Sequence, residues 1–393
     1  MILTGIERLA GDAGLAHKWG RCGLVANQAS IASDFRHALN ICLDHPRLEL
    51  RALFGPQHGF QATVQDNMIE TSHMVHGPTG LPVYSLYSET REPTAEMLKG
   101  LDTLVIDLQI VGCRVYTFKY TIAACLRAAV KHGLKVVVLD RPNPLGGVRS
   151  EGRVLSMDAT SFVGEFPIPM RHAMTPGEAA RYFNQKIGAE LEVVTMTGWD
   201  ARCYWHELGL PWVLTSPNLP TVESVYAYPA TVMLEGTNIS EGRGTGLPFQ
   251  FVGAPWIRDG AAFVKRVREL YGAGGGVYLR ETAFEPTSQK YQGETCQGLQ
   301  IHILEAAEIR TYPLGISLIR AAREQDEGAF AWKQPPYEYN FETLPFRLIM
   351  GDLRADQELE DAGFNPAAAH WSAGVDGWGG DVRACWLYDR PEG

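Results

Sequence analysis

Short apolar runs recur along the first half of the chain, and each ends in polar residues or in Gly and Pro. The runs are rich in Val, Ile and Leu without polar alternation, which is typical of strands covered on both faces. Between two of them, segment 121–132 has apolar residues at helical spacing. Alternating strands and helices predict βαβ units and a parallel sheet. The predicted strands are 23–26, 48–54, 82–86, 103–106, 135–139 and 191–196.

The remainder of the chain predicts a smaller α/β domain. Helices are expected at 261–271 and 313–323, and strands at 277–280 and 298–303. The tail from residue 334 is rich in Pro, Tyr and Gly, and we expect it to wrap back over the rest. The predicted fold class is therefore α/β. A Rossmann-like, parallel-sheet catalytic domain over 1–245 is followed by a smaller α/β domain over 246–393 that completes the cleft.

Composition and charge disfavour several classes of protein. Apolar residues make up 45% and charged residues 20%, as in ordinary globular proteins. The net charge of -10 disfavours nucleic acid and anionic membranes as partners, because both need clustered Lys and Arg. The apolar runs are far shorter than the roughly 20 residues of a membrane span. Seven scattered cysteines and a start without a secretory leader pattern predict reduced thiols and a cytoplasmic location.

Motifs for several common chemistries are missing. The segment 26–32, after the first predicted strand, contains no Gly, whereas a dinucleotide site needs Gly-x-Gly-x-x-Gly there. The sequence also lacks a P-loop, a His-Glu-x-x-His motif and a Gly-x-Ser-x-Gly elbow. We therefore predict no cofactor and assign no metal ligands, although Asp and His side chains from distant loops could converge on a metal. The missing glycine loop disfavours the alternative of an oxidoreductase on the same sheet.

The sheet itself predicts where a ligand binds. In open parallel sheets, ligands bind in the crevice beyond the carboxyl ends of the strands. Four predicted strands end in polar groups, which are also common in simple turns. Four such ends together favour a shared site. The residues are Asn27, Gln57, His58, Asp107, Asp140 and Asn143.

Two further segments are unusually polar. Segment 234–246 offers Glu235, Glu241 and Arg243 among glycines that could let a ligand approach the backbone; Glu241 and Arg243 could instead form an ion pair that holds a loop. Segment 107–117 adds Arg114 and Tyr116. Such groups fit a sugar, whose hydroxyls take polar partners and whose C–H face packs on aromatic rings.

Together these stretches resemble a known family. The sequence is similar to the bacterial exo-β-N-acetylmuramidases, a glycoside hydrolase family. This resemblance implies release of terminal β-linked N-acetylmuramic acid from the non-reducing end of peptidoglycan fragments, in cell-wall recycling, with a muropeptide or amino-sugar substrate. The matching stretches are 23–28, 53–59, 81–87, 107–117, 139–147, 169–175, 216–221, 234–246, 284–290 and 296–302.

The chain departs from the family pattern at two positions. Many members have Glu where this chain has Gln57, and many have a second Asp where it has Ile110. An amide cannot donate a proton as a carboxylic acid does, so Gln57 cannot be the general acid. Three explanations remain. The general acid is another carboxylate, the sugar specificity differs, or the protein binds muramyl sugars or peptides without hydrolysing them. The candidate carboxylates are Glu70, Asp107, Asp140, Glu235 and Glu241.

The catalytic hypothesis follows from the chemistry of glycoside hydrolysis, which uses two carboxyl groups. We expect Glu235 or Glu241 as one of the pair and Asp107 or Asp140 as its partner or as a hydroxyl anchor, unless the substrate's own acetamide attacks. Arg114, Arg171 or Arg243 would meet the lactyl carboxylate. The predicted substrate-binding residues are Asn27, Gln57, His58, Arg114, Tyr116, Asn143, Arg171, His172, Asn218, Asn238 and Arg243.

Overall fold

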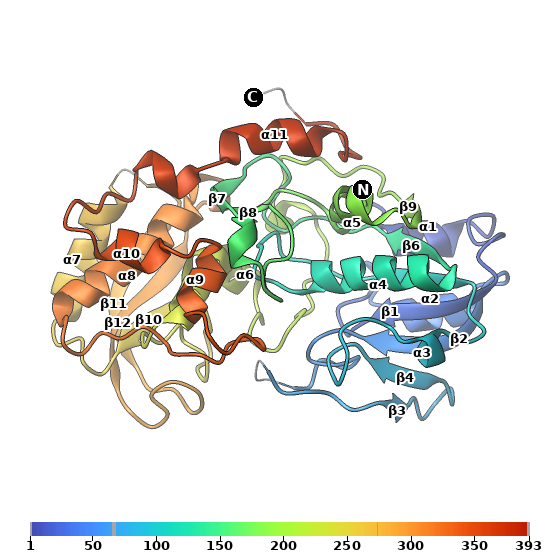
Figure 1. Ribbon diagram of the computed structural model, residues 1–393, viewed down its shortest axis with the longest axis horizontal. Coiled ribbons are helices and arrows are strands. Elements are labelled where there is room, and N and C mark those ends of the chain that lie inside the picture. Colours follow the sequence, from blue (N-terminus) through green and yellow to red (C-terminus); the bar gives the residue numbers. More distant parts are fainter. Residues whose placement is uncertain (1, 65–67, 273, 391–393) are drawn as a thin grey trace.

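The computed structural model, which describes residues 2–64, 68–272 and 274–390, builds a seven-stranded sheet from the first half of the chain (Figure 1). All neighbouring strands are parallel except β3 and β4. The strand order is β3(Met74–Val75), β4(Pro82–Ser85), β2(Glu49–Gly55), β1(Arg21–Ala26), β5(Thr103–Asp107), β6(Lys135–Leu139) and β9(Glu190–Val194). The six predicted strands are thus confirmed, and β3 is an addition that the pattern did not predict.

Both faces of the large sheet are covered. Leu24 packs in a core with α1(Gly5–Gly11) and α2(Ala38–Asp44), whereas Val25 packs in the core that includes α4(Phe118–His132) and α5(Pro176–Ile187). Because successive residues of a strand face opposite layers, both must be apolar. This explains why the strands read as unbroken apolar runs.

The second half of the chain forms a smaller α/β unit, in orange and yellow in Figure 1. Its antiparallel sheet has the order β10(Phe251–Ala254), β12(Cys296–Ile303) and β11(Val277–Phe284). Helices α7(Gly260–Tyr271) and α8(Thr311–Gln325) pack against each other, and α7 also packs on β11 and β12. The predicted α/β class, with a large parallel sheet followed by a smaller unit, is confirmed.

Shorter elements complete the molecule, and most of them carry no clear sequence pattern. Helix α6(Val222–Thr231) runs directly into the 3₁₀ helix η3(Val232–Gly236) and packs on α8 and β12. The predicted domain limit between residues 245 and 246 stays a prediction. Helix α6 lies between the last strand of the large sheet and β10, the first strand of the smaller one. The others are α3(Ala95–Leu98), β7(Glu151–Val154), η1(Met157–Ala159), β8(Pro169–Arg171), η2(Trp205–Glu207), η4(Ala306–Glu308), α9(Pro345–Met350), α10(Ala355–Glu360), η5(Ala369–Ser372) and α11(Val375–Arg383).

The tail returns over the large sheet, as predicted. After α11, which lies along the top of the view in Figure 1, Tyr388 donates its hydroxyl to Asp140 at 2.5 Å. Arg390 forms a buried ion pair with Glu178 at 2.6 Å. These contacts tie the end of the chain to the strand end of β6 and to α5.

The buried Asp140 carboxyl makes the stability depend on pH. Burial outweighs its hydrogen bonds and raises the pKa of Asp140 from 3.8 to about 7. A carboxyl whose pKa is raised on folding stabilises the protein below its unfolded pKa, and this contribution disappears as pH rises through the folded pKa. We therefore expect the unfolding free energy to fall by on the order of 4 kcal/mol between about pH 4 and pH 7.

Denaturant unfolding of the wild type and Asp140→Asn, measured side by side across this range, checks the prediction. Because every other titrating group is common to both proteins, the difference between their unfolding free energies isolates Asp140. The unfolding free energy of the wild type, relative to that of Asp140→Asn, should fall as pH rises. A difference that does not depend on pH would contradict a raised pKa of Asp140.

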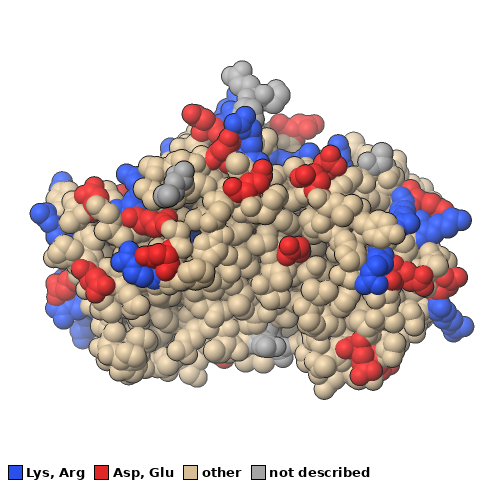
Figure 2. Space-filling view, turned by 180° about the vertical axis from the view of Figure 1, so that it is seen from behind, with Lys and Arg blue, Asp and Glu red and all other residues tan. Residues whose placement is uncertain are grey.

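Charged side chains of both signs are interspersed over the face shown in Figure 2, and its lower part carries few of them. Within 2–64, 68–272 and 274–390, no helix has both the length and the apolar character that crossing a membrane requires.

Candidate active site

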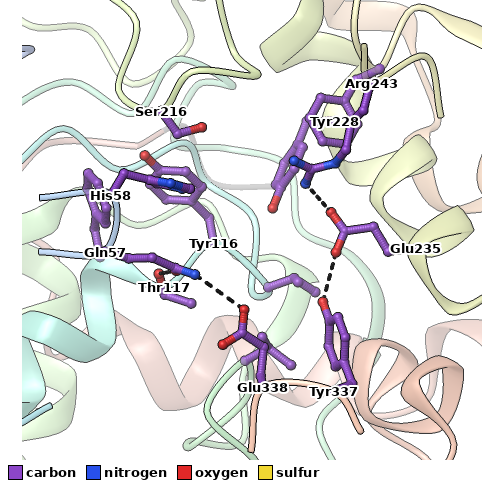
Figure 3. Close-up of a pocket in the computed structure, with 14 residues that line it drawn as sticks. Gln57, His58, Tyr116, Thr117, Ser216, Tyr228, Glu235, Arg243, Tyr337 and Glu338 are labelled. Carbon is purple, nitrogen blue, oxygen red and sulfur yellow. Dashed lines mark hydrogen bonds and ion pairs between the residues drawn. The ribbon is translucent and has the colours of Figure 1, made fainter. Parts of the chain in front are cut away.

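A buried pocket lies where loops from the carboxyl edge of the large sheet meet the second half of the chain (Figure 3). The space between its lining atoms is about 450 Å³, counting space that is open to solvent. The loop after β2 supplies Gln57 and His58, and the loop after β5 supplies Tyr116 and Thr117. The other lining residues are Val115, Phe118, Val163, Ser216, Tyr228, Glu235, Arg243, Phe249, Tyr337 and Glu338.

Gln57 connects the sheet edge to Glu338. Its Oε1 accepts a hydrogen bond from the Thr117 hydroxyl at 2.6 Å, and its Nε2 donates to Glu338 Oε1 at 3.2 Å. The other oxygen of Glu338 accepts from the Tyr87 hydroxyl at 2.7 Å. The Glu338 carboxyl is thereby fixed from two sides.

Across the pocket, Glu235 lies between a cation and a phenol (Figure 3). Arg243 forms an ion pair with Glu235 Oε1, and Tyr337 donates its hydroxyl to Oε2 at 2.9 Å. Arg243 also pairs with Glu241 at 3.1 Å, and Lys290 pairs with Glu241 at 2.9 Å. Two buried anions are therefore balanced by two cations, with only Glu235 and Arg243 of the four lining the pocket.

The network shifts the pKa of its arginine and of one of its carboxylates in opposite directions. Burial alone would lower the pKa of Arg243, but Glu235 and Glu241 outweigh it, so that pKa lies above its ordinary value. The pKa of Glu241 is lowered, because attraction to Lys290 and Arg243 exceeds the opposing effect of burial. Both groups remain charged at neutral pH.

His58 presents an acceptor to the pocket. Its Nδ1 lies 2.7 Å from the carbonyl oxygen of Val64, which can only accept, so Nδ1 carries the proton. Burial lowers the pKa of His58 to about 4, which leaves Nε2 unprotonated at neutral pH. His58 is also held at a φ of 71°, in the left-handed region that a non-glycine residue adopts when surrounding structure enforces it. A hydroxyl or amide N–H of a ligand is the partner that Nε2 can take.

The structure brings together five of the residues singled out in the sequence. Gln57, His58, Tyr116, Glu235 and Arg243 all line the pocket, and Glu241 lies directly behind it through its ion pairs. The Tyr116 hydroxyl is buried without a hydrogen-bond partner in the described part of the chain.

The predicted aspartates lie outside the pocket lining. Asp107 is fully buried in an ion pair with Arg141, with Nη2 to Oδ2 at 2.7 Å. Asp140 accepts from the Thr175 hydroxyl at 2.8 Å and the Gly177 amide at 2.7 Å, as well as from Tyr388. These contacts give both carboxylates a structural role, and their catalytic assignment stays a prediction.

The remaining basic candidates also hold the protein together. Arg114 donates to the carbonyl oxygens of Arg153, Ile168 and Ile349 at 2.9–3.0 Å. Arg171 pairs with Glu151 at 3.0 Å, and His172 Nδ1 accepts from the Met174 amide at 3.1 Å. None of these three cationic or imidazole groups lines the pocket.

Three of the four predicted asparagines brace loops. Asn27 donates to the Thr215 carbonyl at 2.8 Å, Asn143 to that of Met174 at 3.0 Å, and Asn238 to that of Ala329 at 2.8 Å. Asn218 is half-buried and does not line the pocket. A role of any of them in substrate binding stays a prediction.

The sequence reasoning missed the residues that the tail contributes, above all Glu338 with its neighbour Tyr337. Tyr228 and Ser216 were missed as well, although Figure 3 shows the Tyr228 hydroxyl directed toward the pocket. The signal available was the polar cluster Tyr337-Glu338-Tyr339 in a tail already predicted to fold back. Among the described residues, no group of three or more His, Cys, Asp and Glu side chains could hold a metal ion.

Comparison with known proteins gives a consistent picture. Two solved DUF1343 family proteins from Bacteroides fragilis share the fold. One is 29% identical with a TM-score of 0.88 and covers 99% of both chains; the other is 24% identical with a TM-score of 0.74 and covers 100% of both. A curated relative, peptidoglycan β-N-acetylmuramidase NamZ of Bacillus subtilis, is 42% identical over 325 residues, 82% of this chain and 78% of that protein.

Two family models cover most of the chain. The N-terminal model of exo-β-N-acetylmuramidase NamZ matches residues 22–223, and its C-terminal model matches residues 226–388. The resemblance inferred from short sequence motifs is therefore confirmed. The chain belongs to the NamZ exo-β-N-acetylmuramidase family.

Proposed function

We propose that this protein is an exo-acting glycosidase that binds a terminal β-linked N-acetylmuramic acid in the pocket and hydrolyses its glycosidic bond. One observation carries the proposal beyond family membership: Glu235 and Glu338 place two carboxyl groups in the lining of one pocket. Most glycosidases use such a pair, one group to protonate the leaving oxygen and the other to assist at the sugar carbon.

The other lining residues suit an N-acetylated sugar acid. The hydroxyls of Tyr116 and Ser216 can hydrogen-bond sugar oxygens, and His58 Nε2 can accept the acetamide N–H or a hydroxyl. Of the three arginines predicted for the lactyl carboxylate, Arg243 is the one in the described pocket lining. We infer that Arg243, with the neighbouring hydroxyl donors, meets that carboxylate.

Substrate discrimination tests the function. 4-Nitrophenyl β-N-acetylmuramide and β-N-acetylglucosaminide differ only in the lactyl group, so their kcat/KM ratio reports recognition of that group. We expect the muramide to be preferred by roughly a hundredfold or more. The glucosaminide lacks the lactyl group, so the polar groups of the site that bind it would be left without partners. Release of nitrophenol from neither compound would favour the alternative of a muramyl-binding protein without hydrolysis.

We further propose that the enzyme acts on peptidoglycan fragments inside the cytoplasm, as part of cell-wall recycling. All seven cysteines are free in the structure, and six of them are buried, which suits a reducing compartment. Fractionation of cells followed by the muramide assay would locate the activity.

A further inference from the structure

Glu338 combines burial with access to the pocket, as Glu235 does on the opposite side. Its residue is 4% exposed, yet it lines the cavity. Asp107 and Asp140 are equally buried but lie elsewhere, and Glu241 lies behind Arg243. Glu338 is therefore a carboxyl that a bound sugar can reach without solvent surrounding it.

The surroundings of Glu338 and Glu235 differ. Burial raises the pKa of Glu338 above its ordinary value; the Tyr87 and Gln57 hydrogen bonds offset this only in part, and the charge of Glu235 adds to it. Glu235, by contrast, forms an ion pair with Arg243. When the environments of two carboxyl groups favour different protonation states, one group can act as the acid and the other as the base or nucleophile.

We propose that Glu338 donates the proton to the leaving glycosidic oxygen, and that Glu235 is the ionised carboxylate that assists at the sugar carbon. This assignment rests on the proposed glycosidase function. As the C1–O bond breaks, its electron pair stays on the aglycone oxygen, which takes the Glu338 proton. The oxygen of water forms the new bond to C1, and the proton that this water gives up restores protonated Glu338, directly or through solvent.

Gln57 then has a positioning role. The Thr117 hydroxyl holds its Oε1, so that Nε2 points to Glu338 Oε1. An amide offers this donor at every pH and carries no charge. A second carboxylate at position 57 would instead repel an ionised Glu338.

The leaving group provides the decisive test. A 2,4-dinitrophenyl muramide departs without protonation, whereas a muramyl disaccharide needs an acid. Glu338→Gln should lower kcat/KM for the disaccharide by roughly 10²–10⁴-fold, the usual contribution of a general acid, and for the dinitrophenyl substrate by less than about tenfold. Equal losses on both substrates would overturn the assignment, because a merely structural role affects them alike.

Two controls keep the outcomes separable. Glu342→Gln changes an exposed carboxylate of the same segment and should leave both rates unchanged. A wild type that cleaves neither substrate would instead defeat the proposed function itself.

A second readout uses the pH profile and applies even if Glu338→Gln fails to fold. Tyr87→Phe removes a hydrogen bond that lowers the pKa of Glu338. The basic limb of kcat/KM, which reports the acid in the free enzyme, should therefore move to higher pH. A limb that does not move would contradict Glu338 as the proton donor.

Discussion

Glu235→Gln is expected to lower kcat/KM for muramides roughly a thousandfold, with the fold intact. Glu235 lines the pocket, and Arg243 and Tyr337 hold its carboxylate in one orientation. The amide is nearly isosteric and keeps an acceptor oxygen, but it cannot carry the negative charge needed at the sugar carbon. Initial rates on a chromogenic muramide, with the melting temperature as a check on folding, measure the effect.

Glu241→Gln is the matched control. It removes the same charge from the same Arg243, but Glu241 contacts Arg243 and Lys290 rather than the cavity. We expect its kcat/KM to remain within about tenfold of the wild type. Equal losses in both variants would mean that the ion-pair network, rather than the Glu235 carboxylate, supports activity.

Arg243→Met is expected to destabilise the protein by about 3–5 kcal/mol. The substitution leaves Glu235 and Glu241 buried near one another with Lys290 as their remaining cation in the described network. An uncompensated buried charge is costly, because neither water nor a counterion replaces the lost partner. Urea unfolding at pH 7 measures the change in unfolding free energy.

Two companion variants define what Arg243 contributes. Arg243→Lys keeps the charge but lacks the planar fork that reaches both carboxylates, so an intermediate loss is expected. Arg36→Met breaks an ion pair with Asp34 whose side chains are more than half exposed, and no measurable loss is expected. If Arg243→Met were as stable as Arg36→Met, the buried network would not hold this part of the structure.

Much of the fold could be predicted because burial on both faces constrains every residue of the central strands. Leu24 and Val25 belong to different cores, so neither position tolerates a polar residue and the run stands out. Short elements such as β7 and β8 could not be predicted. Each covers few residues, and the two pair with each other although they lie on separate stretches of the chain.

The part of the candidate site that could be predicted lies at the carboxyl edge of the large sheet, where backbone topology alone brings side chains together. Gln57 follows β2 and Tyr116 follows β5, and both line the pocket. Asp107 and Asp140 occupy equivalent strand ends, but a buried Arg141 and a helix N-terminus bind them. Sequence position does not distinguish a carboxylate that faces a cavity from one that braces the scaffold.

Glu338 lay beyond prediction because its partner Gln57 is 281 residues away in sequence. Nothing in the local pattern around residue 338 indicates which part of the large sheet the tail will contact. Two glycines of segment 234–246, where the sequence suggested that a ligand could approach the backbone, pack closely against other parts of the protein. A Cβ at Gly236 would meet the Phe346 backbone at 2.6 Å, and one at Gly244 the Ser288 carbonyl oxygen at 2.2 Å. These two are therefore needed for close packing within the protein.

The central claim is that the terminal muramic acid occupies this pocket, between Glu235 and Glu338. A crystal structure of Glu235→Gln with an intact muramyl disaccharide tests it most directly. The account predicts the N-acetylmuramic acid ring in the pocket, with the glycosidic oxygen within hydrogen-bond distance of Glu338 and the lactyl carboxylate near Arg243. A disaccharide bound elsewhere on the protein, with this pocket empty, would contradict it.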